Sequence, residues 1–188
     1  MKFVFDTNKS IAAAAYLSKK PGESLTVLFL IKMLYAADRE ALLSWHRTIT
    51  GDTPVSMDNG PVLTRIYNLT KGVVSGKDMI AWDRVFQRRT EKSIKLQPDV
   101  EVDPLLDFLS DREIETLDRA YKRVKNVKGK LADWAHITFP EWKNPKSSSL
   151  PIDFAEILSL EGFSEMQIKE IEAEISSSQS AKRALQAA

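Results

Sequence analysis

The feature that most restricts the fold is a nearly uninterrupted apolar run early in the chain. From Leu25 to Leu34 every residue is apolar except Thr26 and Lys32. The run is far shorter than the roughly 20 apolar residues that span a bilayer. A helix that is apolar on nearly every side belongs in the interior of a protein. We therefore expect a buried central helix over residues 24–46, with the other elements packed around it.

Apolar periodicity and capping signals predict a mainly helical, compact α+β domain around this helix. The sequences "SDRE" from Ser110 and "SEMQ" from Ser164 have the form of a capping box, in which the first and fourth residues satisfy each other's backbone N–H groups. Helices are expected over 8–20, from Pro61 to Gly72, from Ser110 to Val124, over 131–136, from Phe154 to Gly162 and from Ser164 to Ile175.

A few short strands are expected between the helices. Turn-forming dipeptides at 51–52 and 59–60 bracket β-compatible residues, which predicts a strand between them. The segment 81–100 changes its period, with β-branched residues among alternating charges. There we expect a two-stranded ribbon, with a polar loop as the alternative. The ribbon would consist of Val85–Arg89 and Ser93–Leu96.

Length and charge bound the domain organisation and the partners. The chain has 188 residues, of which 43% are hydrophobic, and a net charge of +1. These values fit a single globular domain, assigned to 1–175, followed by a serine-rich tail over 176–188 that we expect to be mobile. The near-neutral charge gives no overall attraction to nucleic acid or to an anionic membrane, so neither is expected as a partner.

No motif of a catalytic, cofactor or metal site is present. The chain has no cysteine, which excludes disulfides and thiolate catalysis and suits a cytoplasmic location. Its two histidines, His46 and His136, lack the spacing of a metal-binding pair. Glycine-rich phosphate loops and a G-x-S-x-G elbow are also missing. We therefore expect no catalytic residue, cofactor or metal.

Asp38 is the most informative polar residue. It lies four and seven residues after Leu34 and Ile31, which places its carboxylate on an apolar stripe of the central helix. A buried carboxylate needs a partner, which Arg39, another arginine or the backbone amides of the following turn could supply. One interpretation is a perturbed acid in a cleft. The other is a structural strut between the helix end and residues 48–60.

Two further segments allow a functional and a structural interpretation. His136 lies between Trp134 and Trp142, either in a pocket with aromatic walls or at a helix end packed beneath two indoles. The basic stretches 87–89 and 121–130 are either a binding patch for RNA, DNA or an acidic protein, or a solvated face.

The segment "IKMLYAADREALLSWHRTITGDTPVSMDNGPV" (31–62) resembles the signature of the Panacea antitoxin domain, also called the SocA-like domain. Members of that family have an apolar helix running into "LLYLADRE", then an "ITGD" turn, a strand, and "GPV" opening the next helix. The later blocks "LSDREIETLDRAYKRV" and "LADWAHITFPEWK" look like the family's second half. The resemblance covers about residues 8–145. The motif positions, which we expect to hold the fold together, are Tyr35, Asp38, Arg39, Gly51, Gly60, Pro61, Trp134 and His136.

The resemblance implies a binding function. Such proteins are antitoxins of bacterial or phage toxin–antitoxin pairs, and they bind and neutralise a cognate protein toxin. One branch acts instead as an adaptor that delivers its toxin to an AAA+ protease. The resemblance supplies no catalytic residues. The alternative from a different class is a small hydrolase or transferase with Asp38, Arg39 and either histidine in a cleft.

A binding protein of this kind should present anchors on an exposed surface. Interfaces concentrate their binding energy in aromatic and arginine side chains. On the predicted ribbon and just before it, the candidate anchors are Trp82, Phe86, Arg88 and Arg89.

Overall fold

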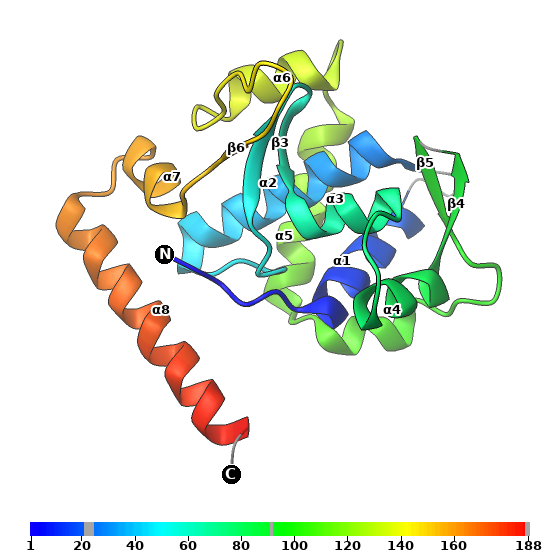
Figure 1. Ribbon diagram of the computed structural model, residues 1–188, viewed down its shortest axis with the longest axis horizontal. Helices are drawn as coiled ribbons and strands as arrows, with labels where there is room; N and C mark the ends of the chain where they lie inside the picture. Colours follow the sequence, from blue (N-terminus) through cyan, green and yellow to red (C-terminus); the bar gives the residue numbers. More distant parts are fainter. Residues whose placement is uncertain (21–24, 91, 187–188) are drawn as a thin grey trace.

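A long apolar helix, α2 (Val27–Trp45), runs through the middle of the computed structural model, as its sequence predicts (Figure 1). The structure describes residues 1–20, 25–90 and 92–186, without the side chains of 88, 89 and 182–186. In chain order the other elements are α1 (Thr7–Lys19), β1 (Leu25–Thr26), β2 (Pro54–Met57), β3 (Gly60–Leu63), α3 (Thr64–Lys71), α4 (Lys77–Val85), β4 (Phe86–Thr90), β5 (Ser93–Leu96), the 3-10 helix η1 (Asp103–Phe108), α5 (Asp111–Lys125), α6 (Leu131–Thr138), β6 (Leu150–Pro151), α7 (Phe154–Leu160) and α8 (Glu165–Gln186).

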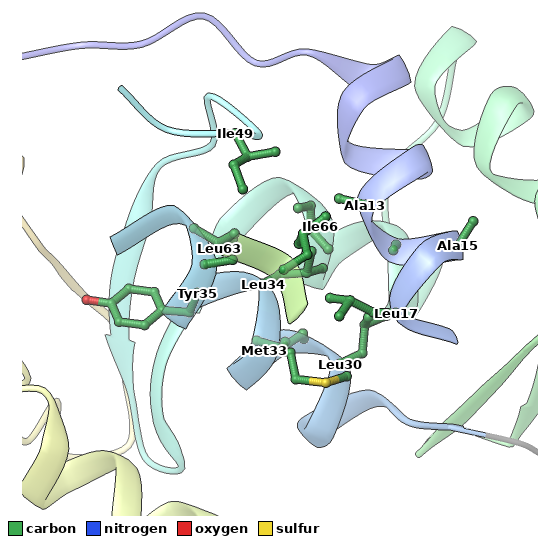
Figure 2. Close-up of a cluster of buried hydrophobic side chains, with 14 of the residues drawn as sticks. Ala13, Ala15, Leu17, Leu30, Met33, Leu34, Tyr35, Ile49, Leu63 and Ile66 are labelled. Atoms are coloured by element: carbon green, nitrogen blue, oxygen red, sulfur yellow. The ribbon is translucent and has the colours of Figure 1, made fainter. Parts of the chain in front are cut away.

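The core forms where α1 and α3 pack against α2. The Thr26 hydroxyl accepts from the Phe29 backbone N–H and caps α2. Figure 2 shows Leu30 of α2 beside Leu17 of α1, with Ile66 of α3 close by. Apolar side chains are buried around the helix, which explains why the run lacks a polar face.

Helix α5 packs against α2 and begins at the predicted capping box. The Ser110 hydroxyl accepts from the Glu113 backbone N–H, and the Glu113 carboxylate accepts from the Ser110 backbone N–H. Its apolar stripe buries Leu117 and Val124, while the opposite face is exposed and charged. The same local exchange occurs between Ser164 and Gln167 before α8. Both predicted capping boxes are confirmed.

The two small antiparallel sheets each contain three strands. The first has the order β1-β5-β4 and contains the predicted ribbon, which begins at Phe86 because α4 continues through Val85. The second has the order β3-β2-β6. Its hairpin pairs Met57 with Gly60 and Ser56 with Pro61.

The predicted helix start at Pro61 is wrong. Pro61 lies in β3, and α3 begins only at Thr64. Because β3 is an edge strand, it tolerates a residue that has no N–H to donate. Gly72 ends α3 in the left-handed conformation, as predicted.

Helices α7 and α8 pack around a second apolar cluster at the end of α2. The cluster consists of Leu42, Ile152, Phe154, Ile157, Leu158, Ile171 and Ile175. Beyond it, α8 continues along one side of the molecule (Figure 1). Residues 176–186, which the sequence assigns to a tail, continue this helix, whereas 187–188 lie outside the described residues. The mobility of the segment stays a prediction.

Candidate functional site

The carboxylate of Asp38 joins α2 to the turn that follows it. The residue is 3% exposed, and Oδ1 accepts from the backbone N–H groups of Ile49 (2.9 Å) and Thr50 (3.1 Å). The Thr50 hydroxyl donates to Oδ2. Burial raises the pKa of Asp38 to about 7, while the hydrogen bonds from Thr50 and Ile49 lower it. Asp38 therefore binds the turn, not an arginine.

The same turn holds the start of α3 and the N-terminal segment. Buried Asp52 accepts from the backbone N–H groups of Arg65 (3.0 Å) and Ile66 (2.9 Å), which lie in the first turn of α3. Gly51 has φ 68°, and a Cβ at this position would lie 2.0 Å from the carbonyl oxygen of Val4. A glycine is required there because the N-terminal segment lies directly against the turn.

A buried charged cluster connects the other face of α2 to the chain's last third. Arg39 Nε donates to Glu141 Oε1 at 2.8 Å, and Nη2 donates to Glu141 Oε2 at 3.2 Å. The Tyr35 hydroxyl donates to the same Oε1 at 2.5 Å, and Figure 2 shows this hydroxyl pointing away from the apolar cluster. Arg39 also pairs with Glu161. Burial raises the pKa of Tyr35 well above its ordinary value, so the phenol stays a donor.

Glu141 was not identified from the sequence, although it is 1% exposed and accepts from two motif residues. A weak signal was present. An acidic residue among the apolar and aromatic residues of "TFPEW" (138–142) is unfavourable unless a partner neutralises it. Sequence spacing could not name Tyr35 and Arg39 as those partners, because they lie more than 100 residues away.

Lys32, the one charged residue of the apolar run, reaches the β2–β3 hairpin. It is 0% exposed, and its Nζ donates to the carbonyl oxygen of Pro61 at 2.6 Å. Burial lowers the pKa of Lys32 to about 7. A Cβ at Gly60, whose φ is 90°, would lie 3.0 Å from this Nζ and 2.8 Å from the Cβ of Ala135 in α6. Gly60 thus allows the hairpin to fit between α2 and α6.

His136 and Trp142 hold the tip of the same hairpin. Their rings stack with centroids 3.7 Å apart. His136 Nε2 is 3.0 Å from the carbonyl oxygen of Asp58, and Trp142 Nε1 donates to that of Met57 at 2.9 Å. The Trp134 ring contacts Phe139 edge-on. The structure therefore places His136 against a loop carbonyl, as the structural interpretation expected, but against the indole of Trp142 alone, where that interpretation expected two indoles.

Two of the four candidate anchors are not on the surface. Trp82 is 1% exposed and Phe86 is 2% exposed, and their rings stack at 4.3 Å within the core. The prediction that they are exposed anchors is wrong, because helix α4 directs Met79, Trp82 and Val85 inward. Arg88 and Arg89 lie in β4, and their side chains are outside the described part of the structure.

The residues of the enzyme hypothesis line neither of two surface cavities formed by the described residues. One of about 860 Å³ lies between α3, α4 and the ribbon, and one of about 720 Å³ lies between the N-terminal segment, α4 and α8. Neither is lined by Asp38, Arg39, His46 or His136. Within 1–20, 25–90 and 92–186, no group of three or more His, Asp or Glu residues could hold a metal ion. No helix in these ranges is long and apolar enough to cross a membrane.

The motif residues thus converge on α2 and the hairpin beside it. A family model described as the antitoxin SocA-like, Panacea domain matches residues 30–143, a range that contains most of α2 and all of the β2–β3 hairpin, α5, α6 and Glu141. No curated protein and no solved structure matches the chain. The family match spans more than half of the sequence, and the chain belongs to the SocA-like Panacea antitoxin domain family.

Proposed function

We propose that this chain is an antitoxin that neutralises a cognate protein toxin by direct protein–protein contact, and that it is not an enzyme. Family membership implies a toxin as partner. One structural observation supports the binding function. Two charged residues of the family signature, Asp38 and Arg39, are buried, and they hydrogen-bond to the Ile49 backbone and to the Glu141 carboxylate within the fold. Their chemistry maintains the fold, which leaves recognition to the outer surface.

The experiment is co-expression of this chain with the product of the adjacent reading frame. The host is one whose growth stops when that product is expressed alone. We expect growth to return when this chain is present, and the two proteins to co-purify. A matched control is the variant Glu141→Ala, which is expected to fold poorly and to restore growth weakly. If growth is restored without any complex, direct contact is wrong. If the adjacent product disappears in a protease-dependent way, the chain acts as an adaptor for an AAA+ protease.

The arginines of the ribbon remain candidate contacts. Because Trp82 and Phe86 are buried, Arg88 and Arg89 are the two predicted anchors that remain candidates for contact with the toxin. The double variant Arg88→Glu with Arg89→Glu is expected to weaken toxin binding without changing the melting temperature, if the ribbon forms the interface. Unchanged affinity would place the interface elsewhere on the molecule.

A further inference from the structure

The two halves of α5 carry charge in different ways. From Asp111 to Arg119 acids and bases are mixed, and several are paired: Arg119 lies 2.5 Å from Glu40 and 3.9 Å from Glu115. After Asp118 the next acidic residue is Asp133. We call the exposed cations between Arg119 and Asp133 the α5 basic patch, and these are Lys122, Arg123, Lys125, Lys128 and Lys130. In the described part of the chain none of the five forms an ion pair.

Helix stabilisation accounts for only part of this patch. Cations in the last turn of a helix interact favourably with its dipole, which explains Lys122, Arg123 and Lys125. Lys128 and Lys130 lie beyond the end of α5, where the dipole effect has decayed. Five like charges within nine residues repel one another, and a merely solvated face would mix signs as the first half of α5 does.

The patch contacts α6 through Arg123 and Trp134, and Ile137 lies three residues after Trp134 on the same helix, which makes the two side chains neighbours on the helix surface. The guanidinium of Arg123 lies 5.9 Å from the ring centroids of Trp134 and of Phe139. Between these two residues in the chain is Ile137, which is 85% exposed. Among the large apolar side chains that the structure describes as exposed, Ile137 has the highest exposed fraction. An apolar side chain near a polar rim is typical of protein interfaces.

We propose that the α5 basic patch and Ile137 form the docking surface for an acidic face of the cognate toxin. This inference rests on the proposed function, because it names the chemistry of that partner. An acidic protein fits better than nucleic acid for three reasons. The net charge is only +1, acids bound the patch on both sides, and phosphate recognition does not use an exposed isoleucine.

The test measures association and dissociation rates between the chain and the purified product of the adjacent reading frame. The patch variant is Lys122→Glu, Lys125→Glu, Lys128→Glu. The matched control changes the net charge by the same amount at exposed positions away from the patch. It carries the substitutions Lys2→Glu, Lys77→Glu and Lys169→Glu. Steering by complementary charge raises association rates by about 10-fold or more. We expect the patch variant to lose at least that factor, and its rate to lose the salt dependence of the wild type. The control should stay within about 2-fold.

The single variant Ile137→Ser tests the apolar part of the surface. We expect it to accelerate dissociation and to leave the association rate and melting temperature unchanged, because short-range contacts act mainly on dissociation. Unchanged dissociation would remove Ile137 from the proposal.

The other outcomes separate the two proposals. If the wild type does not bind the adjacent product, the proposed function fails. If the wild type binds and the patch variant binds equally fast, the docking surface alone is wrong. Loss of binding only in Arg88→Glu with Arg89→Glu would move the contact to the ribbon. If the wild type binds a single-stranded DNA or RNA 20-mer, and the patch variant loses that binding but keeps its toxin affinity, the patch is a nucleic-acid site.

Discussion

The region around α2 and the β2–β3 hairpin differs in construction from the α7–α8 region. The first buries charged and polar side chains, including Lys32, Asp38, Asp52 and Glu141, each bonded to a specific group. In the second, no charged group is buried among the side chains that the structure describes in α7 and α8. Its core is apolar, and the ion pair of Arg47 with Glu174 beside it is exposed.

This difference indicates how precisely each region fixes the positions of its helices and strands. An unpaired buried polar group is costly, so a cluster of them excludes arrangements in which any partner is displaced. Apolar packing tolerates small shifts because it has no direction. We infer that the first region determines one position for the hairpin and α6, whereas the second holds α8 with less angular precision. The following predictions test this comparison, from the largest effect to the smallest.

Glu141→Ala should have the largest effect. It leaves Arg39 and Tyr35 buried without their shared acceptor, which costs about 3–5 kcal/mol of unfolding free energy. The matched change in the second region is Glu174→Ala, which removes an exposed ion pair with Arg47 and should cost less than about 1 kcal/mol. Urea denaturation measures both. Equal losses would contradict the contrast between the regions.

Asp38→Ala should come next. Two backbone N–H groups and the Thr50 hydroxyl lose their acceptor, at a total cost of about 2–4 kcal/mol. Asp38→Asn keeps an acceptor of the same shape and should cost less. If Asp38→Ala retains full stability and only toxin neutralisation is lost, the residue acts on the partner and the structural interpretation is wrong.

Glycine substitutions compare crowding in the two regions at matched φ. Gly60 has φ 90° and Gly162, between α7 and α8, has φ 89°, so each substitution places an alanine at a positive φ that L residues rarely adopt. Only Gly60 is crowded, by Ala135 and Lys32, whereas nothing lies within 4 Å of a Cβ at Gly162. Gly60→Ala should therefore cost about 1–3 kcal/mol more than Gly162→Ala. Melting temperatures of the two variants give the comparison, and equal shifts would show that the hairpin can move away.

Lys32 should make stability depend on pH. Burial lowers its pKa from 10.5 to about 7, so between these values the unfolded chain holds a proton that the folded chain has released. The contribution of Lys32 to the free energy of unfolding therefore increases as the pH rises from about 7 towards 10.5. The increase is at most about 1.4 kcal/mol per pH unit. Lys32→Met should abolish that rise in denaturation curves. A rise that persists in the variant would assign it to another group.

Deleting residues 181–188 should have the smallest effect. The last contacts that the structure describes for α8 with the body are those of Ser178 with Arg47 and of Gln179 with Lys2. We expect a change within about 0.5 kcal/mol and rapid amide hydrogen exchange over 181–186 in the full chain. Slow exchange there would show that this end of the helix is held in place.

Local physics explains which elements could be predicted from the sequence. The apolar run of α2 and the boxes at Ser110 and Ser164 depend on residues a few positions apart, and all three were confirmed. Pro61 was misassigned because its strand is determined by pairing with Ser56, which a local pattern does not contain. Helix α4 was missed because it has only nine residues and its buried stripe consists of only Met79, Trp82 and Val85.

The motif residues of the site could be picked out from the sequence, but Asp52, Glu141 and the long-range contacts could not. The structural role expected for Asp38 agrees with its bonds to the turn, since these partners lie within twelve positions. Asp52 caps a helix that begins after a hairpin, and Glu141 meets Arg39 across 102 positions. Such partners depend on tertiary folding, and no spacing rule in a single sequence identifies them.

The distance along the chain between Arg39 and its partners also sets an order in time. Glu141 follows Arg39 by 102 residues and Glu161 by 122. At ordinary rates of protein synthesis the ribosome needs roughly 5–20 seconds to add that length. During this interval α2 has been synthesised, but the two glutamates that neutralise its arginine have not. The central helix is therefore synthesised early, but its buried arginine gains its acidic partners only after the last third of the chain has been synthesised.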